Sequence, residues 1–576
     1  MNATWKRVIW WLEFIGPLVV AFPFLFNFVT IVKDKPASQA FGIVLLTALY
    51  WILEPIPIVV TSFIPIVFMP LFGVSTAKAI ASSMFSDTSL IFLGGFIFSI
   101  AMVRWNLHSR IALKTVLIFG LRPNILLLGI IIITAFLSMW ISNTATALTM
   151  VPNAIAIISK IEEMTGDPSS VAPFAKALFL GIAYSASIGG MATLIGTPPN
   201  LIFAQVAADS FPKAPPIGFA QFLFVALPVS VVIIVVMYFF FVIFYIRKIK
   251  LPTNMDESIF RENYERLGKW SPAEIIIGIM FILLALLWFF RADLEFGEKA
   301  KLVGWTNRLF KKGSSYIQDG TVALIMAILL FIIRVPAPSP KFEKKLEQAE
   351  VDLELRKRNN HNAPKFHTPL ELSSSDEEEE VVGLEQELPE EEDPDKKWVP
   401  LVDWEYVQSK IPWTILFLFS GGFALNQGFK DSTLDSWIGN NLSGLSNLPL
   451  FVLLVCITFL TAALSNIASN TACANILLPI VAALAKNAQK HHPWVLMIPT
   501  AFATSCCFIM PVATPPNLIC FGSGRLTTKD FVTAGAAINV LSLFLVIGLC
   551  IALVPPVFDA KGFPDWANTG TNSTKA

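Results

Sequence analysis

The chain has 576 residues, of which 55% are hydrophobic and 15% are charged, and its formal net charge is zero. An ordinary soluble domain carries about 25% charged residues, so this composition excludes one. The balanced charge identifies no partner, and no nucleic acid is expected to bind. Apolar runs of membrane-spanning length recur from Val8 to Val557, which predicts an all-α polytopic membrane protein in contact with the lipid bilayer.

About eleven crossings and two re-entrant hairpins are predicted. The crossings, in chain order, are 8–32, 39–55, 57–73, 88–104, 173–208, 216–247, 273–291, 318–335, 412–429, 494–522 and 531–555. The segments 122–160 and 446–487 differ from these, because each holds two apolar arms around a centre of small and polar residues. Each arm is too short to span comfortably, so each segment is expected to be a re-entrant hairpin.

Lysine and arginine residues set the expected orientation. A cytoplasmic N-terminus places four basic clusters inside: 6–7, 104–122, 247–250 and 525–529. The basic loop 292–317 then falls outside the cell, which is contrary to the rule that basic loops lie in the cytoplasm. An odd number of crossings places the C-terminus outside the cell, where a sequon predicts glycosylation of Asn572. A second sequon, at Asn441, is also predicted outside. The plasma membrane is the expected location.

Two further segments have their own signatures. Residues 338–400 include the run "SSSDEEEEVVGLEQELPEEEDPDKK" and almost no aromatic residues, which predicts a disordered cytoplasmic loop. The stretch "WNLHSRIALK", residues 105–114, is amphipathic and basic, and it is expected to lie on the inner membrane surface.

The polar centres of the two hairpins belong to an internal repeat. The stretch "LSMWISNTATALTMVP" begins at 137 and "LSNIASNTACANILLP" begins at 464, an offset of 327 residues (464 − 137). The glycine pair of "FLGGF" recurs in "LFSGGF" at the same offset (421 − 94). The break "ATLIGTPPNLI" recurs in "PVATPPNLI", where Thr514 matches Thr197 at an offset of 317 (514 − 197). Three matched motifs in one order indicate a true repeat.

The repeat is expected to be inverted. Five of the predicted crossings lead from the first glycine-pair helix to its twin, and a re-entrant hairpin adds none, so the second copy enters from the opposite side. Inverted repeats with interrupted helices are typical of secondary transporters, whose binding site lies near the membrane midplane where the repeats meet.

The repeated motifs offer groups for two kinds of ligand. Proline ends a helix and frees the carbonyls before it, and these join hydroxyl and asparagine oxygens in a set that suits a small cation. Exposed amides at the N-termini of half-helices favour an anion. The triplets 142–144 and 469–471 are therefore interpreted as functional, since unpartnered polar groups cost about 4–8 kcal/mol each in hydrocarbon. Single residues such as Thr134, Ser187 and Asn426 are interpreted as structural.

The sequence contains no serine, histidine and aspartate motifs in the order of a serine hydrolase. It also contains no metal-binding motif, Walker loop or nucleotide-binding fingerprint. An enzyme is therefore not expected, and an ATP-driven pump is unsupported.

The chain resembles the divalent-anion/sodium symporter family, solute carrier family 13, over nearly its whole length. The distinctive stretches are "SMWISNTATA", "YSASIGGMATLIGTPPN", "KIPWTILFLFSGGFAL", "TSCCFIMPVATPPNLI" and "FPDWAN". The last of these is similar to the animal carboxylate branch of the family. The resemblance implies sodium-coupled symport of di- and tricarboxylates such as succinate, malate, fumarate and citrate.

The resemblance also implies a homodimer with an elevator mechanism, in which a transport domain moves against a scaffold domain. The implied division takes 1–121 as N-terminal scaffold helices with an interfacial helix and 122–210 as the first hairpin and broken helix. Further segments are scaffold helices 211–337, the acidic loop 338–400, the second-repeat scaffold or arm 401–445, the second hairpin and broken helix 446–530, and the last helix with its extracellular end 531–576.

By the same resemblance, two sodium sites and one substrate site fall on matched positions of the repeat. One sodium site maps to Ser138, Ser142, Asn143 and Gly196, and the other maps to Ser465, Ala468, Asn470 and Ala513. Several of these residues would act through backbone carbonyls, which is why alanine and glycine can serve. The substrate carboxylates would meet Asn143, Thr144, Thr197, Ser469, Asn470, Thr471, Thr514 and Pro515.

Several positions at the implied substrate site depart from the family pattern. Animal carboxylate carriers often have glycine in place of Pro198 and threonine in place of Ala147, and the citrate branch has valine at Thr471. These departures leave dicarboxylate and citrate both open. A sulfate symporter is an alternative, although its usual hairpin has serine where this chain has Ala145. A sodium-independent carboxylate exchanger and, from another class, an anion channel are further alternatives.

Overall fold

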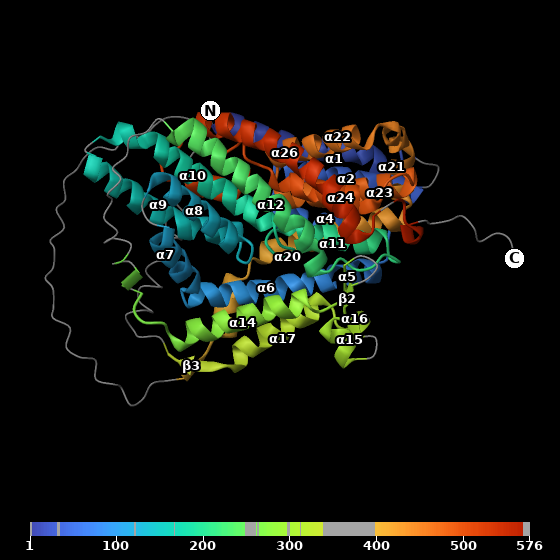
Figure 1. The fold of residues 1–576 in the computed structure, drawn as a ribbon. Coiled ribbons are helices and arrows are strands. Elements are labelled where there is room, and N and C mark those ends of the chain that lie inside the picture. Colours follow the sequence, from blue (N-terminus) through green and yellow to red (C-terminus); the bar gives the residue numbers. More distant parts are fainter. Residues whose placement is uncertain are drawn as a thin grey trace.

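The structure is a computed structural model, and it describes residues 3–31, 35–119, 122–165, 167–247, 267–296, 300–310, 313–337, 398–560 and 562–567, together with 261 and 264–265. Helices form nearly all of the regular structure in this part of the chain, and four short strands make two antiparallel pairs (Figure 1). The predicted disordered loop lies almost wholly outside the described residues, and so does Asn572.

The first repeat and the helices before it occupy the N-terminal part of the chain. The helices up to the first hairpin are α1 (Ala3–Leu25), α2 (Lys35–Leu53), α3 (Ile58–Thr61), α4 (Phe63–Leu71), α5 (Ala77–Met84), α6 (Asp87–Arg104) and α7 (Leu107–Phe119). The hairpin and the broken helix follow as α8 (Pro123–Ser138), α9 (Asn143–Thr165), α10 (Pro168–Met191) and α11 (Pro198–Ser210).

The middle of the chain carries the strands, three longer helices and three short helical elements. These elements are α12 (Phe219–Phe241), η1 (Val242–Ile246), α14 (Pro272–Phe289), β1 (Leu294–Phe296), β2 (Ala300–Leu302), α15 (Trp305–Leu309), α16 (Gly313–Tyr316), α17 (Asp319–Ile332), β3 (Arg334–Pro336) and β4 (Trp398–Pro400). Strand β1 pairs with β2 and β3 pairs with β4. The basic loop predicted at 292–317 is therefore partly folded.

The second repeat occupies the C-terminal part. Its elements are α19 (Trp404–Lys410), α20 (Trp413–Asp431), α21 (Leu434–Leu442), η2 (Ser443–Asn447), α22 (Leu450–Ser465), α23 (Asn470–Ala488), α24 (Pro493–Ser505), α25 (Pro515–Phe521), α26 (Thr528–Phe558) and η3 (Asp565–Ala567). The repeat is visible in these bounds, because α22 and α23 begin 327 residues after α8 and α9 (450 − 123 and 470 − 143).

The described helices have the length and composition of a polytopic membrane protein. Eight of them are long and apolar enough to cross a membrane, and five shorter apolar helices, which include α8 and α22, accompany them. A polytopic helical membrane protein is thus confirmed, while the expected eleven crossings remain a prediction. The predicted crossing 57–73 is divided at Ser62 into α3 and α4, and 173–208 is divided into α10 and α11.

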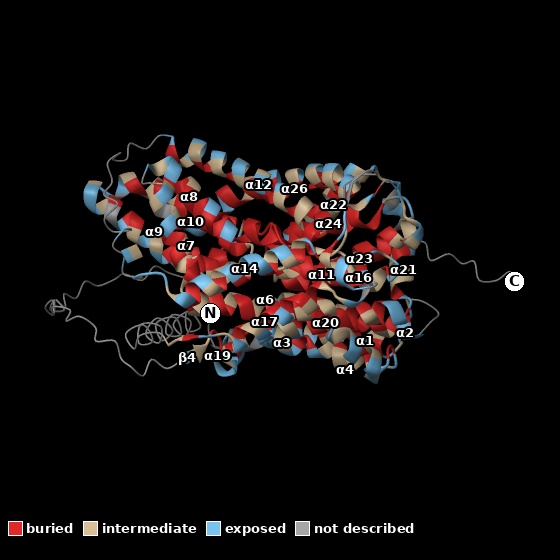
Figure 2. Ribbon diagram, turned by 60° about the horizontal axis from the view of Figure 1, so that its bottom comes forward, coloured by how far each residue is buried: buried red, intermediate tan, exposed pale blue. Residues whose placement is uncertain are grey.

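The helices form two groups that face each other. Helix α6 packs against α17 and α14, and α20 packs against α4 and α5. In the other group α10 packs against α8, α9 and α12, and α26 packs against α12, α24 and α22. In Figure 1 the helices α6, α14 and α17 lie side by side below α10, α12 and α26. The largely buried helices α11, α23 and α24 lie between these outer layers (Figure 2).

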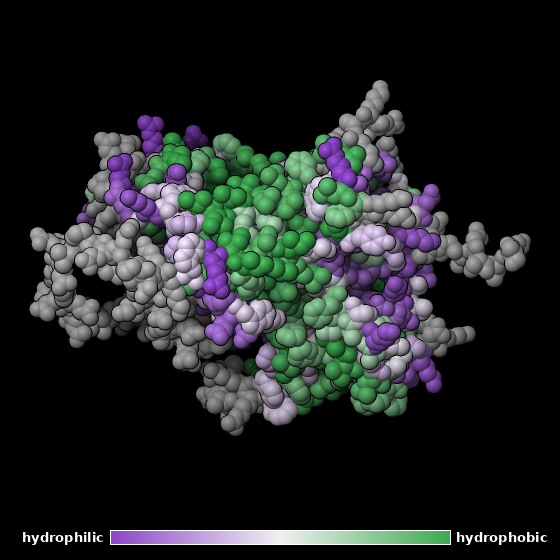
Figure 3. Space-filling view, turned by 90° about the horizontal axis from the view of Figure 1, so that it is seen from below, coloured by the Kyte–Doolittle hydropathy of each residue, from purple (hydrophilic) through white to green (hydrophobic). Residues whose placement is uncertain are grey.

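The outer helices expose apolar side chains over a broad face. Helix α14 exposes Ile279 and Ile282, and α17 exposes Ile328 and Ile332, each by more than half of its surface. Figure 3 shows this face as a wide apolar area with polar residues at its margins. Such a surface is too large for a soluble protein and suits contact with lipid.

The basic stretch 105–114 does not present all of its charges to the membrane surface as expected. It belongs to α7, where Arg110 is buried and its Nε lies 2.6 Å from Glu274 Oε1. The Arg110 guanidinium also donates to the carbonyls of Leu267 and Gly268. A buried arginine is tolerated because this carboxylate and these carbonyls satisfy it. The pair therefore fastens α7 to the start of α14.

Candidate functional site

The first polar triplet forms the start of a helix. Helix α8 ends at Ser138 and α9 begins at Asn143, so the chain turns in the four residues between them. Ser142 precedes α9, and its hydroxyl accepts a hydrogen bond of 3.2 Å from the Ala145 N–H. Serine is a favoured residue at this position because its oxygen satisfies an amide that has no partner within the helix. The polar residues therefore end one apolar arm and begin the next.

Three oxygens crowd together at this first tip. The Ser138 hydroxyl oxygen lies 2.6 Å from Asn143 Oδ1 and 2.6 Å from the backbone carbonyl oxygen of Ala186 in α10. Ser138 is fully buried, and its hydroxyl carries a single hydrogen. One hydrogen cannot be donated along both short contacts at full strength, so the cluster has more acceptor oxygens than donated hydrogens.

The second tip repeats this cluster in full. The Ser465 hydroxyl lies 2.8 Å from Asn470 Oδ1 and also contacts the carbonyl oxygen of Thr504 in α24. The Asn470 Nδ2 group donates to Cys507 Sγ at 3.3 Å, which directs the amide oxygen toward Ser465. Exchanging the oxygen and nitrogen of the Asn470 amide would break this hydrogen bond, so the excess of acceptor oxygens at the second tip does not result from the orientation of the amide.

A cation placed at such a cluster would supply the missing positive charge. Hydroxyl, amide and backbone oxygens are hard, neutral ligands, and carbonyls freed at unwound helices are the usual ligands of sodium in membrane transporters. Among the described residues no group of three or more histidine, cysteine, aspartate or glutamate side chains could hold a metal ion. The two clusters therefore fit a monovalent alkali cation better than a transition metal.

The two helix breaks are also alike in detail. Thr197 and Thr514 both have extended backbones, with φ and ψ of −145° and 143° in the first and −150° and 148° in the second. Each is followed by two prolines that begin a helix, where the missing N–H is tolerated. Both threonines are buried. Helices α9, α11, α23 and α25 thus each begin at or beside a residue that the family resemblance implies for the substrate site.

Within each repeat the structure brings the predicted sodium residues of tip and break toward each other. A Cβ added to Gly190 would lie 2.4 Å from Asn143 Oδ1, and one added to Gly196 would lie 2.5 Å from the Gly190 carbonyl. Gly190 therefore links Asn143 to Gly196 by close backbone packing. In the second repeat Cys507 takes the place of this glycine, and its thiol forms hydrogen bonds with the side chains of Asn470 and Thr514.

The remaining predicted residues lie at or beside the same tips and breaks. Thr144 and Thr471 are the second residues of α9 and α23, Ser469 immediately precedes α23, and Ala468 lies buried in the second tip. Ala513 donates its N–H to the Met510 carbonyl in the second break. Pro515 is the first residue of α25 and is exposed.

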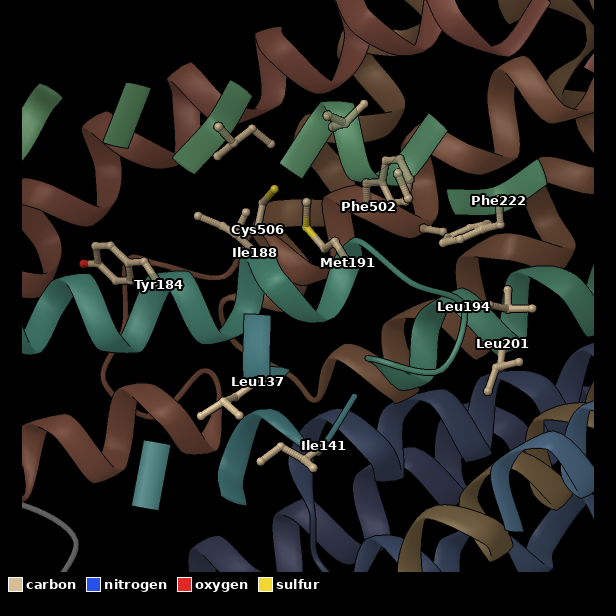
Figure 4. Close-up of a cluster of buried hydrophobic side chains, with 14 of the residues drawn as sticks. Leu137, Ile141, Tyr184, Ile188, Met191, Leu194, Leu201, Phe222, Phe502 and Cys506 are labelled. Atoms are coloured by element: carbon tan, nitrogen blue, oxygen red, sulfur yellow. The ribbon is translucent and has the colours of Figure 1, made fainter. Parts of the chain in front are cut away.

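The two repeats interlock through their helices. Helix α9 of the first hairpin packs on α25 of the second break, and α23 of the second hairpin packs on α11 of the first break. Figure 4 shows the apolar support beside them, where Leu137 and Ile141 of the first hairpin lie near α10 and Cys506 lies at the end of α24. Each hairpin is thus held by the broken helices of both repeats.

Sequence reasoning missed three residues at these breaks. Asn200 and Asn517 follow the two proline pairs, and their amides bond carbonyls of the preceding loops. Cys507 contacts two predicted substrate residues. The signal for the asparagines was present, since both stand at the same place in the duplicated "TPPNLI".

Comparison with known proteins gives matches over most of the chain. The family model described as sodium:sulfate symporter transmembrane region matches residues 9–558. The chain is 34% identical to solute carrier family 13 member 2 of Homo sapiens, covering 94% of this chain and 93% of that protein. It is 33% identical to the sodium-dependent dicarboxylate transporter SdcS of Staphylococcus saprophyticus, over 94% and 91%, and 31% identical to the Na(+)/citrate cotransporter of Rattus norvegicus, over 94% and 95%.

Two solved structures share the fold at low sequence identity. The structure of MtrF from Neisseria gonorrhoeae, described as one of a class of antimetabolite efflux pumps, aligns with a TM-score of 0.51 at 13% identity, over 93% of this chain and 97% of that chain. The YdaH transporter of Alcanivorax borkumensis aligns with a TM-score of 0.50 at 11% identity, over 83% and 89%. These likenesses concern the fold alone.

Proposed function

The chain belongs to the sodium:sulfate symporter family, and from that membership we propose that it is a secondary active transporter that couples sodium to the uptake of small di- or tricarboxylates. Relatives named for dicarboxylate and citrate transport, each about one third identical over nearly the whole chain, support this substrate class. Sodium is then a transported ion and not a resident cofactor.

The observation that carries the proposal is the duplicated oxygen cluster. Ser138 and Asn143 in one repeat, and Ser465 and Asn470 in the other, each meet a backbone carbonyl of a neighbouring helix in the same way. Two such clusters on one substrate site would provide two sodium sites. The residues proposed to complete them are Ser142 and Gly196 in the first and Ala468 and Ala513 in the second.

The substrate carboxylates are proposed to lie between the two clusters. The N-termini of α9, α11 and α23 supply amides without helical partners and the positive end of the helix dipole, both of which favour an anion. The side chains proposed to select it are those of Asn143, Thr144, Thr197, Ser469, Asn470, Thr471 and Thr514, together with Pro515. The site then needs no arginine or lysine, because sodium and helix ends neutralise the carboxylates.

The proposed mechanism is an elevator movement of the group that carries both hairpins. Helix α12 packs on α10 and α26, so we place α12 with that moving group, although the family resemblance implies that 211–337 as a whole belongs to the scaffold. Helices α14 and α17 pack on α6 and remain scaffold elements. A homodimer in the plasma membrane, a cytoplasmic N-terminus and an extracellular, glycosylated C-terminus complete the proposal.

A sulfate symporter is the second candidate, because the matching family model is described by that substrate. Sulfate is smaller than succinate and would also be held by helix N-termini. The alanine at 145, where a sulfate carrier is expected to have serine, argues for the carboxylate. A sodium-independent carboxylate exchanger would use the same substrate site without sodium bound at the two oxygen clusters.

Uptake into liposomes that contain the purified protein tests these alternatives together. Labelled succinate, citrate and sulfate are supplied with an inward sodium gradient and, separately, with choline in place of sodium. Symport predicts saturable carboxylate uptake that requires sodium. Equal uptake in choline would remove the symport proposal in favour of the exchanger, and uptake of sulfate alone would favour the second candidate.

A further inference from the structure

Two asparagines that none of the three proposed binding sites includes occupy matching positions in the two breaks. Asn200 is the third residue of α11 and Asn517 is the third residue of α25, at the offset of 317 that relates the two breaks (517 − 200). Both side chains are fully buried. Burial of a carboxamide in the middle of a membrane protein demands an account of its hydrogen bonds.

The amide nitrogens hold the same two carbonyls in both repeats. Asn200 Nδ2 lies 3.2 Å from the Gly190 carbonyl oxygen and 2.7 Å from that of Thr193, and a third contact of 3.2 Å reaches Met191. Asn517 Nδ2 lies 2.9 Å from the carbonyl oxygen of Cys507 and 3.0 Å from that of Met510. Positions 507 and 510 correspond to 190 and 193 at the same offset, so the arrangement is duplicated.

In each repeat, one of the held carbonyls belongs to a residue that contacts the tip asparagine. Gly190 packs against Asn143, and Cys507 accepts the hydrogen bond of Asn470. The break asparagine therefore acts on the tip asparagine through one intermediate residue. This connection runs from Asn200 to the first oxygen cluster and from Asn517 to the second.

Both break asparagines form their hydrogen bonds through the side-chain NH₂ group. The oxygens Asn200 Oδ1 and Asn517 Oδ1 are buried and have no hydrogen-bond partner in the part of the chain that the structure describes. Each side-chain amide thus donates its N–H groups to backbone carbonyls before the helix, while its own oxygen stays buried without a hydrogen bond. Because an unpaired buried oxygen costs free energy, this orientation indicates that holding those carbonyls in place is the role of the side chain.

We propose that Asn200 and Asn517 are the positioning residues of the two sodium sites, one for each repeat. By holding the loop carbonyls, they fix Gly190 and Cys507, and through these residues the Asn143 and Asn470 oxygens that face the cation. The inference rests on the proposed sodium coupling. It assigns the two asparagines no direct contact with sodium or substrate.

The test replaces each asparagine by aspartate, which keeps the shape and one oxygen but removes the N–H donors, and by alanine, which removes both. Sodium is titrated against the thermal stability of the purified full-length protein, and uptake is measured as a function of sodium concentration. Loss of at least one net buried hydrogen bond predicts a rise in half-saturating sodium of about fivefold or more in each variant. The maximal uptake rate at saturating sodium is expected to be retained.

Asn426→Ala is the matched control. Asn426 is also a buried asparagine, but its Nδ2 donates to Asp209 Oδ2 at 3.0 Å, outside both breaks. This control is expected to change the sodium-free melting temperature and to leave the half-saturating sodium concentration at the wild-type value. A positioning role is thereby separated from a general loss of stability.

Several results would overturn the inference. In one such result, Asn200→Asp or Asn517→Asp binds sodium at least as tightly as the wild type, while the matching alanine variant binds it more weakly. The asparagine oxygen would then be a direct cation ligand. An unchanged sodium titration in both variants would assign the asparagines to the fold alone. Asn200→Ser and Asn517→Ser, which keep one donor, are used if the other variants do not fold, and failure of all of them to fold would also assign the residues to the fold. Sodium-independent uptake by the wild type would instead defeat the proposed function itself.

Discussion

Replacing Ser138 or Ser465 by alanine tests whether the two oxygen clusters bind cations. Each change removes one of three clustered oxygens and leaves the asparagine oxygen and the backbone carbonyl in place. Both serines are fully buried, so water cannot replace the lost oxygen easily. If sodium is bound there, each variant should weaken sodium binding while leaving the fold intact.

The size of the effect follows from the interaction that is removed. A hydrogen-bonding group that acts on a charge contributes about 1.5–3 kcal/mol, which corresponds to a loss of roughly 10- to 150-fold in sodium affinity. Because the clusters are duplicated, both variants should fall in this range. Ser187→Ala is the matched control, since Ser187 is buried in α10 next to Ala186 and its hydroxyl has no partner among the described residues. This control should bind sodium as the wild type does.

The assay is the initial rate of succinate uptake in proteoliposomes at increasing external sodium, combined with the sodium dependence of the melting temperature in detergent. Both measurements should move together in Ser138→Ala and Ser465→Ala. The reasoning fails if these two variants keep the wild-type sodium midpoint, because the crowded oxygens would then be an ordinary hydrogen-bonding arrangement. It also fails if Ser187→Ala shifts the midpoint by the same amount, since the effect would then not be specific to the clusters.

Three further predictions concern the substrate site and the acidic loop. Asn143→Ala and Asn470→Ala should each abolish transport while the protein remains folded in the membrane, because each removes a cation ligand and a substrate donor; near-normal uptake in either would make the tips structural. Deleting 345–395 should leave uptake largely intact, since this segment is too acidic and apolar-poor to pack, and complete loss in a well-expressed deletion would contradict this. Succinate should outcompete citrate, because the fixed ring of Pro198 narrows the site, and Pro198→Gly should shift competition toward citrate; an unchanged ratio would dismiss Pro198 as the selector.

The parts of the fold that the sequence could predict are those encoded locally. The paired helices expected at 122–160 and 446–487 are found as α8 with α9 and α22 with α23, because apolar arms, a serine before the helix and prolines at the breaks each act within a few residues. The arms α9 and α23 are, however, long and apolar enough to cross a membrane, so the expectation that every arm is too short was wrong for these two and the re-entrant course stays a prediction. The duplicated motifs also marked which polar residues would lie at matched tips. A polar triplet within an apolar run thus has a local meaning that a single chain can reveal.

The parts that the sequence could not predict depend on contacts between distant segments. The carbonyls of Ala186 and Thr504 complete the oxygen clusters, yet nothing in their own side chains distinguishes them from their neighbours. The burial of Arg110 against Glu274 likewise depends on how α7 meets α14. Such partners are chosen by packing between helices, which the hydrophobic pattern of one helix does not specify.

The environments of the two repeats differ in a way that bears on alternating access. At the first tip the ring of Trp140 lies 4.7 Å from that of Phe281 in α14, whereas the matched Ile467 at the second tip is 73% exposed. The second glycine of each pair shows the reverse: a Cβ on Gly422 would lie 2.0 Å from Asn475 Oδ1, but one on Gly95 would meet nothing within 4 Å. Two halves with the same local geometry therefore make unequal contacts with their surroundings. We propose that the two repeats, which are expected to be inverted, exchange these two sets of contacts during alternating access.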